Sequence, residues 1–125
     1  MQRWIAAALA IFNGVNGLVM LFAGSVWWES VPGVSDTGPF NPHFVQDVGA
    51  AFLVSGLALA ARAWRAAYWP AAVAGAGFLL VHAAIHLAMI VGGHDHHAAA
   101  NLATVILPAV LALYSAFPNR GGQHA

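Results

Sequence analysis

Residues 69–91, WPAAVAGAGFLLVHAAIHLAMIV, form the apolar stretch that decides the fold of this chain. Its only titratable side chains are those of His82 and His86. A bilayer core about 30 Å thick requires about 20 apolar residues at a helical rise of about 1.5 Å per residue. Because a spanning segment has to satisfy its backbone hydrogen bonds internally, we predict that this stretch is a transmembrane helix.

The rest of the chain repeats this pattern. Of its 125 residues, 61% are hydrophobic and only 6% are charged, whereas a soluble domain carries about 25% charged residues. We therefore predict an all-α fold in a single membrane domain, residues 1–125, built as a four-transmembrane-helix bundle. The predicted helices are residues 4–24, 43–63, 69–91 and 98–117. The outer connection at 25–42 contains three prolines and two glycines after Val31, so we expect no helix there. Pro108 is expected to kink the last span.

All four cationic side chains fall on one side of this arrangement. Arg3 precedes the first span, Arg62 and Arg65 lie between the second and third, and Arg120 follows the fourth. Cytoplasmic connections carry an excess of arginine, so we predict that the N- and C-termini are cytoplasmic. A cleaved signal peptide is the alternative for the first segment. The length of the apolar run and its interruption by Asn13 and Asn16 count against that alternative.

Composition also excludes several classes of function. The formal net charge is zero and there is no cysteine, which excludes a basic nucleic-acid surface, a disulfide framework and a thiolate metal site. The sequence contains no glycine-rich phosphate loop, HExxH motif or nucleotide fingerprint. We expect the lipid bilayer as partner and no nucleic acid, with a homo-oligomer or a larger membrane complex left open. The pattern leans against an enzyme.

Polar side chains inside membrane spans are costly and usually face the bundle interior. His43 and Asp47 are four residues apart, as are His82 and His86, so each pair lies on one helix face. Counting inward from the predicted ends places both pairs in the outer half of the bundle. We therefore predict one polar pocket that opens towards the non-cytoplasmic side.

Imidazole and carboxylate groups suit divalent transition metals, and helical bundles build such sites from facing helices. We expect His43, Asp47, His82 and His86 to bind a copper, zinc or iron ion in a metal-binding, transfer or accessory role. Other polar residues are expected to orient the ligands or to guide ions inward. These residues are Asn16, Asn101, His94, Asp95, His96 and His97.

Two alternatives remain open at this point. A b-type haem with two histidine axial ligands, His43 with His86 or His82 from two protomers, would make the protein an electron-transfer module, although the outer side offers no lysine or arginine for the haem propionates. Alternatively, the polar residues only link helices, and the protein is a non-catalytic accessory subunit of a larger membrane complex.

One region resembles known proteins. It comprises WWE at 27–29, PGV at 32–34, TGPFN at 37–41 and HFVQDVG at 43–49. These motifs are similar to an uncharacterised family of small bacterial four-helix membrane proteins, DoxX-like in general character. The resemblance covers about a fifth of the chain. It implies a multi-pass protein of the bacterial inner membrane and assigns no functional residues.

Overall fold

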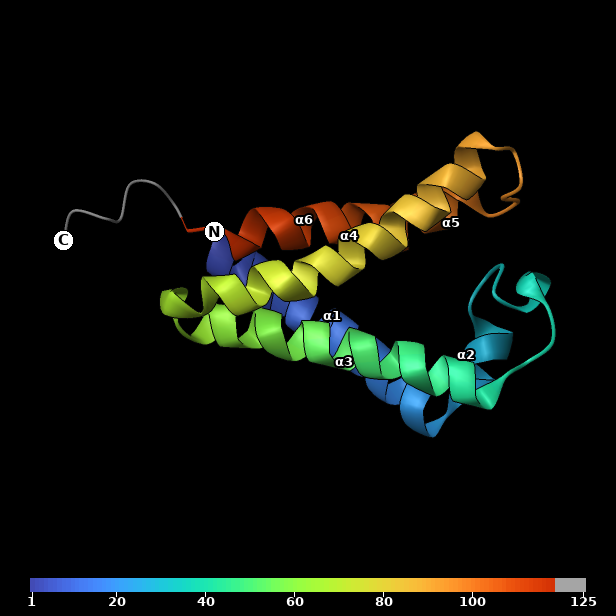
Figure 1. The fold of residues 1–125 in the computed structure, drawn as a ribbon, viewed down its shortest axis with the longest axis horizontal. Coiled ribbons are helices and arrows are strands. Elements are labelled where there is room, and N and C mark those ends of the chain that lie inside the picture. Colours follow the sequence, from blue (N-terminus) through green and yellow to red (C-terminus); the bar gives the residue numbers. More distant parts are fainter. Residues whose placement is uncertain (119–125) are drawn as a thin grey trace.

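The computed structural model describes residues 1–118, and within this range the chain is helical apart from turns and short connections (Figure 1). Arg120 lies outside the described residues. In chain order the elements are α1 (Gln2–Phe22), α2 (Gly24–Ser30), the 3-10 turn η1 (Ser35–Thr37), α3 (Pro42–Trp64), the 3-10 turn η2 (Ala66–Tyr68), α4 (Trp69–Val91), α5 (Ala98–Asn101), the π-helical segment η3 (Leu102–Ile106) and α6 (Leu107–Ala116).

Four helical stretches are long and apolar enough to cross a membrane, which confirms the predicted all-helical architecture. They cover Gln2–Phe22, Pro42–Trp64, Ala66–Val91 and Ala98–Ala116. The last stretch is composite, because α5, η3 and α6 follow one another without a break. Pro108 lies in the first turn of α6, directly after the π-helical segment. Its missing N–H group removes one hydrogen bond to the preceding turn, which explains why the irregular segment lies there.

Glycines bring α1 and α3 into the most extensive helix contact of the bundle. A Cβ atom added to Gly17 would lie 2.6 Å from the carbonyl oxygen of Gly49. One added to Gly56 would lie 2.8 Å from the backbone nitrogen of Gly14. Such close backbone approach is typical of membrane helices. In lipid there is no hydrophobic driving force between helices, so they associate through the close packing that small residues allow.

The remaining contacts complete the bundle. α3 packs on α4, α4 packs on α6, and α6 also contacts α1. The buried core between them consists mainly of alanine and leucine, including Leu59, Ala76, Leu79 and Ala112. Figure 1 shows the α1–α3 pair and the α4–α6 pair close together near the N-terminus and further apart at the opposite end.

The connection at 25–42 differs from its prediction at its beginning. α2 covers Gly24–Ser30, whereas no helix was expected there. The helix-breaking residues start only at Pro32, and the indole of Trp27 donates a 2.8 Å hydrogen bond to the Asn16 side chain of α1. This bond fixes the short helix against the end of the first span.

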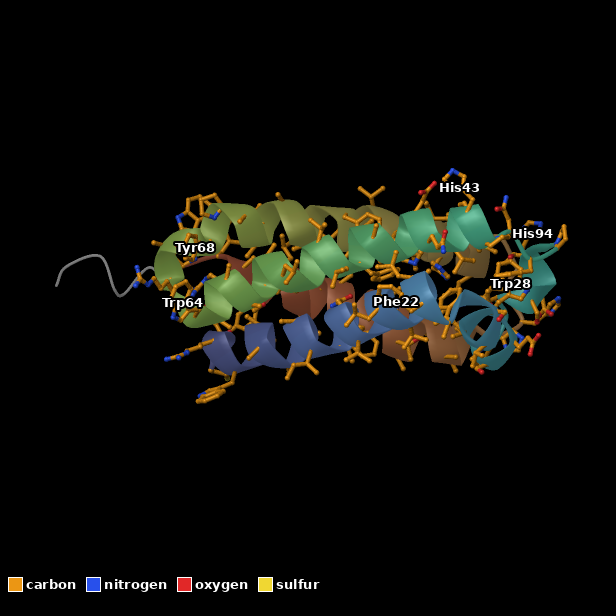
Figure 2. The ribbon with its side chains drawn as sticks, turned by 90° about the horizontal axis from the view of Figure 1, so that it is seen from below. Phe22, Trp28, His43, Trp64, Tyr68 and His94 are labelled. Atoms are coloured by element: carbon orange, nitrogen blue, oxygen red, sulfur yellow. The ribbon has the colours of Figure 1, made fainter. Side chains whose placement is uncertain are left out.

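The two ends of the bundle carry different side chains (Figure 2). Trp64 and Tyr68 lie together at one end, near the turn between α3 and α4, whereas Trp28, His43 and His94 lie at the other. Arg62 and Arg65 belong to the first end. We refer to this end as the arginine end and to the opposite one as the histidine end.

Candidate functional site

Two histidines of α4 are in contact near the histidine end. The ring centroids of His82 and His86 are 4.8 Å apart, with the rings edge to face. The i, i+4 spacing places both side chains on the same face of the helix, as predicted. Phe52 of α3 and Phe78 of α4 pack against the His82 ring at centroid distances of 5.4 and 6.0 Å. The His82 ring is therefore in contact with two phenylalanine rings in addition to His86, and we refer to these two rings as the aromatic wall of the pair.

The imidazole of His86 has a nitrogen without a partner. Its Nδ1 atom is buried and makes no hydrogen bond within the described part of the chain. Buried polar atoms in proteins are almost always hydrogen-bonded, and an exception requires an explanation. A bound ligand is one such explanation, because the imidazole nitrogen would then be occupied.

Asp95 organises the turn that follows α4. Its carboxylate accepts hydrogen bonds from the Asn101 side-chain amide at 2.8 Å and from the backbone N–H of His97 at 2.7 Å. The Asn101 amide and then the His97 N–H hold the pKa of Asp95 below its ordinary value, and the His86 and His97 imidazoles add smaller contributions. Asp95 is therefore an anion at neutral pH, on the turn that follows the helix carrying His82 and His86.

His97 links two segments at the histidine end of the bundle. Its Nε2 atom lies 3.2 Å from Oδ2 of Asp36 in η1. The imidazole also packs so closely on Gly33 that an added Cβ atom would lie 2.9 Å from His97 Cδ2. The connection between α2 and α3 is thereby held against the turn between α4 and α5. Asp36 was not among the predicted site residues, because nothing in the sequence pairs it with a histidine 61 positions later.

The second predicted pair lies elsewhere. His43 and Asp47 are 3.7 Å apart, but their side chains are 85% and 67% exposed. Val45 and Gly49, two residues further along in each case, are buried. Two positions correspond to about 200° around a helix, so His43 and Asp47 lie on the opposite face. Figure 2 shows the His43 side chain pointing away from the bundle. The expectation that they join His82 and His86 in one pocket is wrong for this reason.

The asparagines do not orient imidazoles as expected. The Asn16 side chain accepts from Trp27 and donates to the sulfur of Met20 at 3.6 Å. Asn101 donates to Asp95. Both residues thus stabilise local structure, and the role of orienting a histidine ligand is not seen for either. His94 and His96 are exposed on the outer turn.

Within residues 1–118, no three histidine, aspartate or glutamate side chains are grouped so that they would hold a metal ion together. The predicted four-ligand site is therefore not assembled, and the closest approach to it is the His82–His86 pair. A haem needs one axial imidazole on each side of its plane. His82 and His86 lie on the same face of one helix, in contact with each other, so these two together do not suit that geometry. A haem held by His43 with His86, or by His82 of two protomers, stays a prediction.

Comparison of the chain with protein-family models, with curated proteins and with solved structures gave no match.

Proposed function

We propose that this chain is a multi-pass protein of the bacterial inner membrane, with cytoplasmic termini, that binds a divalent copper, zinc or iron ion at the His82–His86 pair. The ion would be held near the outer surface, in a metal-binding, transfer or accessory role. The observation that carries the proposal is the contact between these imidazoles together with the unpartnered Nδ1 atom of His86.

The distance between the rings supports two-point chelation. A metal ion lies about 2.0–2.1 Å from a ligating imidazole nitrogen, and therefore about 3 Å from the ring centroid. Two imidazoles bound to one tetrahedral or octahedral ion then have centroids about 4.4–5.1 Å apart. The separation of 4.8 Å between His82 and His86 falls within this range.

The surroundings of the pair favour a cation that exchanges readily. Asp95 supplies a nearby negative charge, while Phe52 and Phe78 exclude water from the inner side. With two protein ligands, water or an incoming donor would complete the coordination sphere. A site of this kind suits the transfer of an ion better than its permanent storage.

The proposal can be tested by adding Cu²⁺ to the purified protein and recording the electron paramagnetic resonance spectrum of the bound ion. Nitrogen hyperfine structure counts the imidazoles on Cu²⁺, and we expect two in the wild type and one in His82→Gln or His86→Gln. Loss of one ligand should weaken binding at least about tenfold. His43→Gln is the matched control, because it removes an imidazole from the other i, i+4 pair, and it should bind as the wild type does.

Three results would contradict the proposal. Unchanged copper binding in the His82→Gln, His86→Gln double variant would leave the pair with a packing role only, as expected of an accessory subunit. An equal loss in His43→Gln would indicate adventitious surface binding. A Soret band in the purified protein that disappears in the double variant would assign the histidines to haem.

A further inference from the structure

A second site lies at the arginine end, remote from the histidine pair. A cavity of about 330 Å³ opens there between the beginning of α1 and the end of α3. Gln2, Arg3, Arg62 and Trp64 are among the residues that line it. Its lining combines two cationic side chains, one amide and one aromatic ring.

The amide that faces this cavity is incompletely bonded. Gln2 is only 9% exposed, and its Nε2 atom donates a 2.9 Å hydrogen bond to the carbonyl oxygen of Tyr114 in α6. Its Oε1 atom is buried and accepts no hydrogen bond within the described residues. Gln2 therefore supplies an acceptor that lacks a donor and lies just behind the cavity wall.

Arg62 brings a buried positive charge to the same cavity. It is 7% exposed, and its Nε and Nη2 atoms donate to the carbonyl oxygens of Ala116 and Phe117 at 3.1 and 3.3 Å. A guanidinium has five N–H donors, so donors remain after these two bonds. Arg62 has no acidic partner within residues 1–118. A buried cation without such a partner is costly, and an anion in the cavity would offset that cost. Arg3, which is exposed, adds a second positive charge at the rim.

We propose that this cavity binds the headgroup of an anionic phospholipid that also carries hydroxyl groups, as in phosphatidylglycerol. The phosphate would accept from Arg62 and Arg3, and a headgroup hydroxyl would donate to Oε1 of Gln2 after the Gln2 side chain turns towards the cavity. The position favours a lipid over a free anion, since tryptophans such as Trp64 at the end of a span typically lie at the level of lipid headgroups. Basic sites between membrane helices are suited to such headgroups.

Native mass spectrometry of the detergent-solubilised protein tests this proposal. With equal amounts of phosphatidylglycerol and phosphatidylcholine, we expect the wild type to retain phosphatidylglycerol. Arg3→Gln should lower its affinity about fivefold, the effect of about one lost cationic contact. Arg65→Gln is the matched control. It removes the same charge from the same end, but Arg65 stacks on Trp64, 4.6 Å from the ring centroid, and is not part of the cavity wall.

Two further measurements separate the ligand sources. Gln2→Met should weaken binding of phosphatidylglycerol but not of phosphatidate, which lacks the headgroup hydroxyls. Inorganic phosphate at the same concentration should not displace the lipid. Equal binding by Arg3→Gln and Arg65→Gln, or displacement by inorganic phosphate, would overturn the assignment. Because Arg3 is exposed, its replacement keeps the test valid even where an Arg62 variant fails to fold.

Discussion

Histidines near the histidine end differ in what their imidazoles contact. His97 lies against Gly33 and reaches Asp36, so its side chain holds two connections together. His82 and His86 instead contact each other and an aromatic wall, and one nitrogen of His86 is left without a partner among residues 1–118. This difference in bonding, rather than the number of histidines, is the reason why we propose a ligand role for the α4 pair.

Asp95 gives a prediction about acid stability. Its pKa in the folded protein lies below the ordinary aspartate value of about 3.9, so its ionised form stabilises the fold above that pH. This contribution should be lost as the pH falls from about 4 through the lowered pKa. Thermal unfolding in detergent should show Asp95→Asn less stable than the wild type at pH 6, and the difference should be smaller at pH 2. A difference that is the same at both pH values would contradict the role assigned to the carboxylate.

The sequence correctly paired His82 with His86 and His43 with Asp47, but it did not determine which way each pair faces. In a soluble protein the apolar face of a helix identifies its buried side. In a membrane helix the lipid-facing side is equally apolar, so this signal is lost. Val45 and Gly49 face α1 because of packing, and His43 and Asp47 consequently point outwards. The hydrogen bonds that occupy Asn16 and Asn101 depend on folded geometry in the same way.

At the scale of elements, the contact between α1 and α3 depends on glycines, and this yields a matched pair of variants. A Cβ at position 17 would meet the backbone of α3 at 2.6 Å, whereas one at Gly14 would meet nothing within 4 Å. Gly17→Ala should therefore destabilise the protein by about 1–3 kcal/mol through overpacking. Gly14→Ala should leave it as stable or slightly more stable, because alanine favours the helix. Chemical unfolding in micelles measures both, and equal effects would contradict this helix interface.

The four long apolar helices were predictable to within three residues at their ends, because apolar length is what a membrane requires. The irregular elements were harder to predict. α2 forms because its seven residues precede the first proline of the connection and Trp27 bonds to Asn16. The kink expected at Pro108 takes the form of a π-helical segment, which depends on how the freed carbonyl groups are rearranged.

At the scale of the whole molecule, side-chain hydrogen bonds between residues far apart in the sequence stabilise both ends of the bundle. Arg62 of α3 bonds to the end of α6 at one end. At the other, His97 bonds across to Asp36. Arginine appeared in the sequence only as a marker of topology, since no local pattern reveals that its donors cap another helix. The proposed metal and lipid sites lie at these two opposite ends.

Both proposals depend on the four helices crossing the membrane with the histidine end outside. The chain has no cysteine, so single-cysteine variants can be labelled with a membrane-impermeant maleimide in intact cells. Ser35→Cys and His96→Cys, in the two outer connections, should react, whereas Ala66→Cys, in the turn between α3 and α4, should react only after the membrane is permeabilised. Labelling of Ala66→Cys in intact cells, or failure of Ser35→Cys and His96→Cys to react there, would contradict the account.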